Sequence, residues 1–276
     1  MPVINTNVSA QLAQDALQVN SKTMSTAMQQ LATGNRINQA KDDAAGLSIG
    51  QNMTSQVRGL NQAVRNVNDG INLLQTADGA LVETSNMLQR MRELAVQSSN
   101  ATNSAGQRGY LDKEFKSLQE EITRIGDNTA WNSTNVFGTG VGAPVSLVFQ
   151  AGMSAGQTIS VSLAGMNATA LALDASKADI LSFGTAQAAI GTVDTAIELV
   201  NSARSRMGAT MNQLSYSADN MVNISTNIAA SRSTIMDTDY ATASATLSKS
   251  QIIQQAATAM LAQANQQPQS VLSLIK

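Results

Sequence analysis

The sequence predicts a mainly α fold: an elongated antiparallel helical bundle or coiled coil with a small β-hairpin region and paired N- and C-terminal helices. Apolar residues recur three and four positions apart over long stretches, which is typical of helices packed along a seam. Aromatic residues make up only 3% of the 276 residues, and prolines number three. Compact globular cores draw on bulky aromatic side chains, whereas long helices pack with Ala, Leu, Ile, Val and Met.

The longest apolar stripe predicts a helix from about Val57 to Ser99, roughly 65 Å long at 1.5 Å per residue. Polar Asp78, Ser85 and Arg92 fall in the same seam, so the stripe changes position in its second half. The stripe comprises Val57, Leu60, Val64, Val67, Ile71, Leu74, Leu81 and Leu88, and then shifts toward Met87, Met91 and Leu94.

Two further stripes predict the partners of this helix. One marks an amphipathic helix from about 106 to 125, and the other runs from Ile190 to Ile228. The three stripes can close on one another as an antiparallel bundle, with methionines filling its core. The shorter stripe is Leu111, Phe115, Leu118, Ile122 and Ile125, and the longer is Ile190, Val193, Ile197, Val200, Met207, Met211, Leu214, Met221 and Ile228.

Between these helices, the stretches VSLVF and TISVSL alternate apolar and polar residues, with a glycine-containing link between them. This pattern predicts a β-hairpin whose inner face carries Val145, Leu147 and Phe149 on one strand. The surrounding residues, 131–185, are rich in Gly, Ser, Thr and Ala. We expect them to form an exposed, variable region.

The two ends of the chain predict a pair of helices that depend on association. Each carries a stripe too small to stabilise an isolated helix against the entropy cost of ordering the chain. Folding coupled to assembly is therefore expected, which suits a polymerising protein. The N-terminal stripe is Ala10, Leu17, Met24 and Leu31 with Ala13 and Ala27 between them, and the C-terminal stripe is Tyr240, Leu247, Ile253, Ala257, Met260, Leu261 and Ala264.

Composition excludes several classes of function. The net charge is −2 and charged residues make up 13%, so no broad basic surface exists to hold a nucleic acid. The chain has neither Cys nor His, which removes the usual ligands of zinc and iron–sulfur sites. The pair Asp42–Asp43 is interpreted as a solvated surface pair rather than a cation site. We expect no cofactor, no membrane span and no nucleic-acid partner.

The segment Gly46–Gly50, GLSIG, matches the G-x-S-x-G pattern that presents the catalytic serine of many hydrolases. A serine nucleophile normally needs a histidine base, and the chain has none. The preceding residues are also polar rather than a buried strand. Pairing of Ser48 with Lys41 or Lys22 remains formally open, but no pattern places either lysine beside it. The protein is not expected to be an enzyme.

Four segments together resemble bacterial flagellin, the filament protein of the flagellum. They are INTNVSA near the start, ATGNRINQAKDDAAGLSI, LQRMRELAVQSSN, and LAQANQQPQSVLSLIK at the end. The resemblance covers roughly residues 1–136 and 186–276 in the correct order. Larger members of the family insert outer domains where this chain has only about 50 residues, so it resembles a short flagellin.

The resemblance implies a division of the chain into layers of a filament. Residues 1–43 and 238–276 would be the inner-tube helices, and 44–56 a spoke linker whose glycines allow a bend. Residues 57–130 and 186–237 would be the outer-tube bundle, and 131–185 the hairpin and exposed region. Trp131 and Ser133 stand where the family commonly has phenylalanine and glycine, and Met236 where an acidic residue is frequent.

The resemblance also implies a function. The chain would polymerise with itself into the bacterial flagellar filament for swimming motility. It would lie outside the cell, exported unfolded without a cleaved signal peptide. Its expected partners are other copies of itself, a flagellar export chaperone, the hook-junction and cap proteins, and in some hosts a Toll-like receptor. The alternative is a hook–filament junction protein, which shares the terminal helices, and a surface adhesin is a third hypothesis.

Two sets of site residues follow. The resemblance implies a receptor-binding patch of Arg90, Leu94 and Glu121. Arg90 and Leu94 lie one turn apart on a helix and so share a face. Leu94 is alternatively an axial packing residue between subunits. The expected subunit-interface residues are Ile4, Leu12, Leu17, Met24 and Leu31 at one end, and Ile253, Leu261, Val271, Leu272 and Ile275 at the other.

Overall fold

The computed structural model describes residues 6–138, 144–174 and 178–274, and the side chains of the last helix as far as residue 266. The chain divides into two units, residues 1–57 with 226–276 and residues 58–225. Helices dominate, and two small antiparallel strand pairs accompany them, as expected for the fold class. The elements are α1 (Val8–Thr33), α2 (Ala44–Ser98), α3 (Ala105–Asn128), β1 (Ala130–Trp131), β2 (Thr134–Asn135), β3 (Val145–Gln150), β4 (Thr158–Leu163), α4 (Phe183–Met236) and α5 (Tyr240–Leu274).

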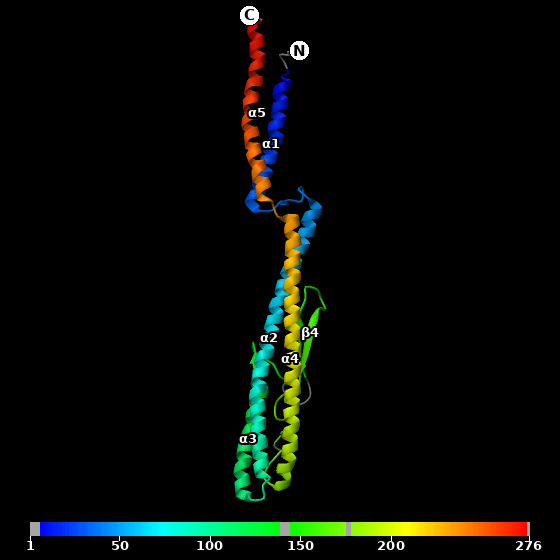
Figure 1. The fold of residues 1–276 in the computed structure, drawn as a ribbon, viewed down its shortest axis with the longest axis vertical. Coiled ribbons are helices and arrows are strands. Elements are labelled where there is room, and N and C mark those ends of the chain that lie inside the picture. The colour runs from blue at the N-terminus through cyan, green and yellow to red at the C-terminus, as the bar shows by residue number, and fades with distance from the viewer. Residues whose placement is uncertain (1–5, 139–143, 175–177, 275–276) are drawn as a thin grey trace. The chain divides into compact units, whose positions relative to one another are not determined.

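In the first unit, α1 and α5 lie side by side and antiparallel (Figure 1). The side-chain amide of Asn20 donates to the backbone oxygen of Ser250 at 2.7 Å, and that of Asn7 donates to the backbone oxygen of Ala264 at 2.8 Å. The expected pairing of the terminal helices is therefore confirmed. The predicted N-terminal stripe faces α5: its members, which are Ala10, Ala13, Leu17, Met24, Ala27 and Leu31, are buried or half-buried.

The stripe of α5 agrees with the expected one only in part: Leu247, Ala257, Leu261 and Ala264 are half-buried as predicted. Tyr240, Ile253 and Met260 were predicted to face α1, but their side chains are 59%, 40% and 64% exposed. The face toward α1 carries mostly small residues. These Ala and Ser side chains let the two helix backbones approach closely. This face consists of the buried or half-buried Ala243, Leu247, Ser250, Ala257, Leu261 and Ala264.

The connections from α1 to α2 and from α4 to α5 are hydrogen-bonded to each other; we call residues 34–43 and 237–239 the joint. The backbone nitrogen of Arg36 donates to the oxygen of Met236 at 2.6 Å, and its guanidinium donates to the oxygen of Ile235 at 2.7 Å. The backbone nitrogen of Thr238 donates to the backbone oxygen of Gly34 at 2.9 Å. The guanidinium thus satisfies a carbonyl at the end of α4, where a cation also interacts favourably with the helix dipole.

The bend expected at the glycines of residues 44–56 is absent, because α2 is already helical from Ala44. The bend falls earlier, at Gly34, whose φ of +73° ends α1 in the left-handed region. Gly46 and Gly50 are helical and serve close packing instead. A Cβ on Gly46 would lie 2.7 Å from the Ile37 side chain, and one on Gly50 would lie 2.5 Å from the sulfur of Met236.

In the second unit, α2, α3 and α4 run alongside one another (Figure 1). Two of the three polar residues in the predicted seam, Asp78 and Arg92, form ion pairs between α2 and α4. Asp78 receives a hydrogen bond from Arg204 at 2.8 Å, and Arg92 donates to Asp194 at 2.6 Å. The predicted core is confirmed: fully buried members of the stripes include Val67, Leu74, Leu81, Leu88, Phe115, Ile122, Val193, Val200, Met207 and Leu214.

The predicted hairpin is confirmed as β3 and β4, which pair antiparallel with Val145 opposite Leu163. It packs against α2 because Gly70 leaves room for an aromatic ring: a Cβ there would lie 2.8 Å from Phe149. A smaller pair, β1 and β2, is joined by Asn132 and Ser133, whose φ angles are +48° and +64°. This backbone favours glycine, which is the physical reason that a serine at this position is a departure.

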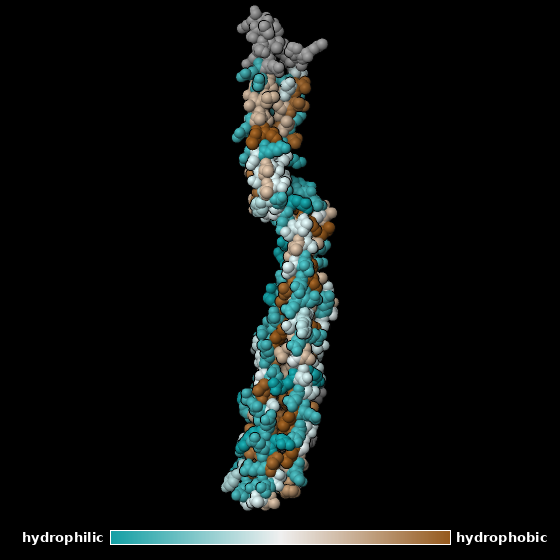
Figure 2. Space-filling view, in the orientation of Figure 1, coloured by the Kyte–Doolittle hydropathy of each residue, from teal (hydrophilic) through white to brown (hydrophobic). Residues whose placement is uncertain are grey.

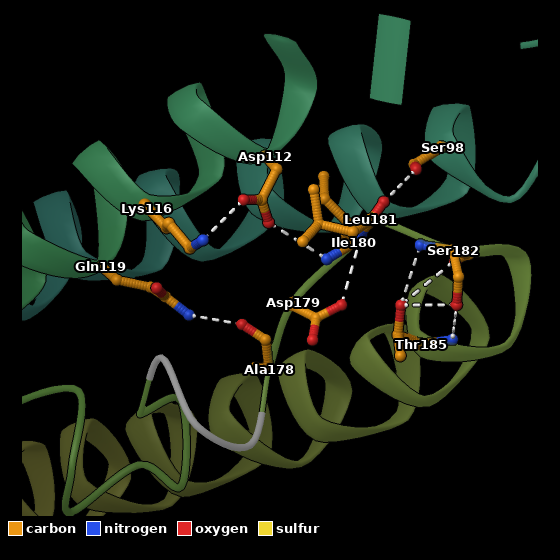
Figure 3. Close-up of polar contacts among 10 residues, drawn as sticks. All are labelled: Ser98, Asp112, Lys116, Gln119, Ala178, Asp179, Ile180, Leu181, Ser182 and Thr185. Carbon is orange, nitrogen blue, oxygen red and sulfur yellow. Dashed lines mark hydrogen bonds and ion pairs between the residues drawn. The ribbon is translucent and has the colours of Figure 1, made fainter. Parts of the chain in front are cut away.

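The prediction that residues 131–185 form an exposed region is wrong for much of the segment. Phe137, Leu171, Leu173 and Ile180 are fully or almost fully buried. The extended residues 178–182, which we call the strap, are held by side chains of α2 and α3 (Figure 3). Local composition gave no sign of this, because the contacts come from residues far away in the sequence.

Buried polar side chains bind the backbone of the strap (Figure 3). Ser98 donates to the oxygen of Ile180 at 2.5 Å, and Gln119 donates to the oxygen of Ala178 at 2.9 Å. Asp112 accepts from the nitrogen of Ile180 at 3.2 Å and pairs with Lys116 at 2.7 Å. These side chains satisfy backbone groups that a sheet or a helix would otherwise satisfy.

The glycines of α3 provide a matched test of this packing. A Cβ on Gly126 would lie 2.7 Å from the backbone nitrogen of Asn167, whereas one on Gly109 would meet nothing within 4 Å. We expect Gly126→Ala to lower the free energy of unfolding by about 1–3 kcal/mol, because backbone must move. Gly109→Ala should raise it by about 0.5–1 kcal/mol. Urea denaturation of the dilute protein measures both, and equal shifts would contradict the described packing.

Candidate functional site

The described residues contain no group of His, Cys, Asp or Glu side chains that could hold a metal ion. Within the same ranges, no helix is both long enough and apolar enough to cross a membrane. Ser48 lies exposed on the first turns of α2, without the preceding strand that a nucleophile elbow requires.

Asp42 and Asp43 serve the backbone of the joint. Asp42 accepts from the nitrogens of Asn38 and Gln39 at 3.2 and 3.0 Å, and Asp43 accepts from the nitrogen of Gly46 at 2.8 Å. Asp43 therefore acts at the start of α2 as an N-terminal cap. The two carboxylates are used in local turns, which agrees with their interpretation as exposed residues rather than cation ligands.

The surface of the α1–α5 pair is the most distinctive candidate for a site, because large apolar side chains remain in solvent there. Apolar side chains lie on both helices in the face shown in Figure 2. Exposed apolar residues on a helix that already buries one stripe mark a second contact surface. On this pair they are Val8, Leu12, Val19, Met28, Ile252, Ile253 and Met260, with exposures from 40% to 73%.

Part of this surface is an open groove of about 660 Å³ between α1 and α5. Its apolar lining comes from Leu12, Ala16 and Val19 on α1 and from Ile253 on α5. Asp15 lines it from α1 and Lys249 from α5, beside the side chains of Asn20, Thr23, Thr246 and Ser250. Exposed apolar side chains beside hydroxyl, amide and charged groups, in a groove open to solvent, are suited to contact with another protein surface.

Charge is scarce on these helices. Asp15 and Lys22 are the charged residues of α1, and Lys249 is that of α5. Solvated helices usually carry charged side chains along their outer faces. Depletion of charge together with exposed Leu, Ile, Val and Met is the composition of an interface core.

The structure separates the predicted interface residues into two groups. Leu12 and Ile253 lie on the exposed surface, with 73% and 40% of their areas accessible. Leu17, Met24 and Leu31 are half-buried against α5, and Leu261 is half-buried against α1. Those four residues hold the pair together. Ile4 and Ile275 lie outside the described residues, as do the side chains of Val271 and Leu272.

The sequence contained a signal for the exposed residues that were missed. Leu12 and Val19 are seven apart on α1, and Ile253 and Met260 are seven apart on α5. A second heptad stripe beside the first indicates a helix with contacts on two sides. Val19 and Met260 continue these stripes and are exposed.

The expected receptor patch is not assembled as predicted. Leu94 is fully buried, so the expectation that it shares an exposed face with Arg90 is wrong. Its alternative use as a packing residue between subunits is excluded for the same reason. Arg90 is half-exposed and donates to Glu93 and Glu114, at 2.9 and 2.8 Å, and these bonds raise the pKa of its guanidinium.

The third residue of that patch, Glu121, lies on α3 with an ion pair of its own. Its carboxylate accepts two hydrogen bonds from Arg124, at 2.8 and 2.5 Å, and they lower the pKa of Glu121. Both partners are exposed enough for water and salt to screen the pair. The patch is therefore a set of solvated charges without an apolar centre.

Comparison with known proteins covers nearly the whole chain. Residues 4–140 match the family described as the bacterial flagellin N-terminal helical region, and residues 190–275 match the bacterial flagellin C-terminal helical region. A flagellin from Halalkalibacterium halodurans is 42% identical over 274 residues, covering 99% of this chain and 100% of that protein. The flagellar filament 33 kDa core protein of Treponema phagedenis is 39% identical over 285 residues, with 99% and 100% covered.

Among solved structures, a putative flagellar hook-associated protein from Vibrio parahaemolyticus covers 70% of this chain and 99% of its own, with a TM-score of 0.57. At 15% identity, this likeness concerns the fold alone. The two family matches and the full-length relatives carry the assignment. The chain belongs to the bacterial flagellin family.

Proposed function

We propose that this protein is a structural subunit that polymerises with itself into the bacterial flagellar filament, outside the cell, and serves swimming motility. The observation that carries the proposal is the α1–α5 pair, which keeps Leu12, Val19 and Met260 in solvent and has almost no charge. Burying that surface requires another protein surface of similar composition. The full-length identity to flagellins supports a second copy of the chain as that partner.

The other partners follow from family membership and belong to the same proposal. An export chaperone would cover the terminal helices before assembly, and the hook-junction and cap proteins would contact the two ends of the polymer. The function is non-enzymatic: the resemblance to flagellin and the solvated position of Ser48 both support a structural role. The alternative, a hook–filament junction protein, is less favoured because the 42% identity extends over a complete flagellin.

Electron microscopy of the purified protein tests the main proposal. Monomers seeded with short filament fragments should grow into long filaments, whereas a junction protein adds a limited layer and stops. Failure of the wild-type chain to elongate under conditions in which a related flagellin does so would refute the proposal.

A contact with a host Toll-like receptor is a narrower proposal. With Leu94 buried, it rests on the exposed side chains of Arg90 and Glu121 and excludes an apolar centre. Contacts between exposed charges chiefly affect association rates and contribute modestly to affinity.

The exposed surface of α1 predicts the effect of a single substitution on assembly. Leu12→Gln should leave the helicity and the unfolding midpoint of the monomer nearly unchanged, since the side chain is 73% exposed. It should raise the monomer concentration that remains after polymerisation by about tenfold. This is the effect expected when a Leu side chain that becomes buried in the filament, worth about 1.5 kcal/mol, is lost. Sedimentation measures this concentration. Gln14→Ala, on the same helix and also exposed, is the matched control.

The receptor proposal predicts a partial loss of response. Arg90→Ala in purified monomer should weaken receptor activation about three- to tenfold in a reporter-cell assay, because one charged contact of the patch is removed. Arg206→Ala, an exposed arginine on α4, should leave the dose–response curve unchanged. Identical curves for the wild type and Arg90→Ala would remove Arg90 from the site.

A further inference from the structure

Two of the three charged residues on α1 and α5 face the same groove, and this arrangement is unexplained by the fold of one copy. Asp15 and Lys249 both line the groove beside Leu12, Val19 and Ile253. Both side chains are exposed. Neither takes part in any ion pair with the other described residues. The two opposite charges on this otherwise uncharged surface are thus unused within the chain.

The register of α1 against α5 keeps Asp15 and Lys249 of one copy apart. The bonds from Asn7 to Ala264 and from Asn20 to Ser250 show that α1 and α5 run antiparallel, and the second places positions 20 and 250 opposite each other. By that register, Lys249 lies opposite position 21 of α1. Asp15 is therefore offset from Lys249 by six residues, or roughly 9 Å along the axis at 1.5 Å per residue. An ion pair needs the two charged groups within about 4 Å.

We infer that Asp15 of one copy pairs with Lys249 of a neighbouring copy, and that this pair sets how adjacent copies align along the α1–α5 helices. The inference rests on the proposed function, because it names the contact within that polymer. A neighbour shifted along the helix axis brings its Lys249 beside Asp15 while its apolar residues enter the groove. Because each copy is shifted relative to the last in the same direction, position 15 of one copy meets position 249 of the next, and the contact repeats without closing.

Chemistry supports a second copy of this chain as the occupant. The groove carries one negative and one positive side chain, so a second copy shifted along the helix axis can present the opposite charge to one of them. The apolar contacts are tolerant of sliding, because Leu, Val and Ile pack in many registers. A charge pair next to an apolar seam favours one alignment and opposes shifted ones, as polar residues do in coiled coils.

Charge reversal tests this contact. Asp15→Lys alone and Lys249→Asp alone each place like charges together at every contact. Each should raise the monomer concentration left after polymerisation by about tenfold or more. Circular dichroism should show unchanged helicity, since both residues are exposed. The double variant D15K/K249D should polymerise nearly as well as the wild type.

A mixture of the two single variants distinguishes an ion pair between copies from an ion pair within one copy. An equimolar mixture of D15K and K249D chains can alternate so that every contact joins Lys to Asp, and it should polymerise where neither chain does alone. D15K mixed with K22D is the matched control, because neither of those chains supplies an acidic residue at position 249. In that mixture the K22D chains, which keep Asp15 and Lys249, should polymerise, whereas the D15K chains should stay in solution.

Two results would overturn the inference. Assembly of D15K alone as well as the wild type would show that the pair is unnecessary. Restoration in the double variant without restoration in the mixture would place the pair within one copy. Failure of the wild type to polymerise at all would instead refute the proposed function, on which the inference rests, so the two failures are distinguishable.

Discussion

The pairing of the two ends of the chain, α1 with α5, is the contact on which the first unit depends. Neither helix carries enough apolar surface on one face to be stable by itself. Small residues such as Ala27 and Ala243 allow close approach of the two backbones. Because the pair is antiparallel, α1 ends where α5 begins. The chain must therefore leave and return at one place, which brings the start of α2 and the end of α4 together in the joint.

Heptad spacing made the helices predictable from the sequence, since it depends on neighbours within the same helix. The hairpin was predictable for the same local reason. The start of α2 was not, because Gly46 and Gly50 were interpreted as a flexible bend. Their actual role depends on Ile37 and Met236, which approach the helix from other segments. A glycine that permits a bend and a glycine that permits close packing are identical in sequence, and only the neighbours distinguish them.

The candidate site was predictable only in part. A heptad stripe shows that a helix has an apolar face, but not whether that face meets the same chain or another one. Leu17 and Leu12 illustrate the difficulty: the first packs on α5 and the second remains in solvent. The burial of Leu94 and of the strap could not be predicted either. Both depend on contacts between segments far apart in the sequence, as Ser98 and Asp112 bonding to Ile180 illustrate.

The joint has a mechanical consequence. Two separate single-chain connections would each swivel about their own backbone bonds with little resistance. Here Arg36 bonds to the last residues of α4 and Thr238 bonds to Gly34, so rotation must break several hydrogen bonds together. The two segments of the joint therefore behave as one short element that resists twisting. A twist applied at the end of α4 is carried into α1 and α5 instead of being lost in a loose linker.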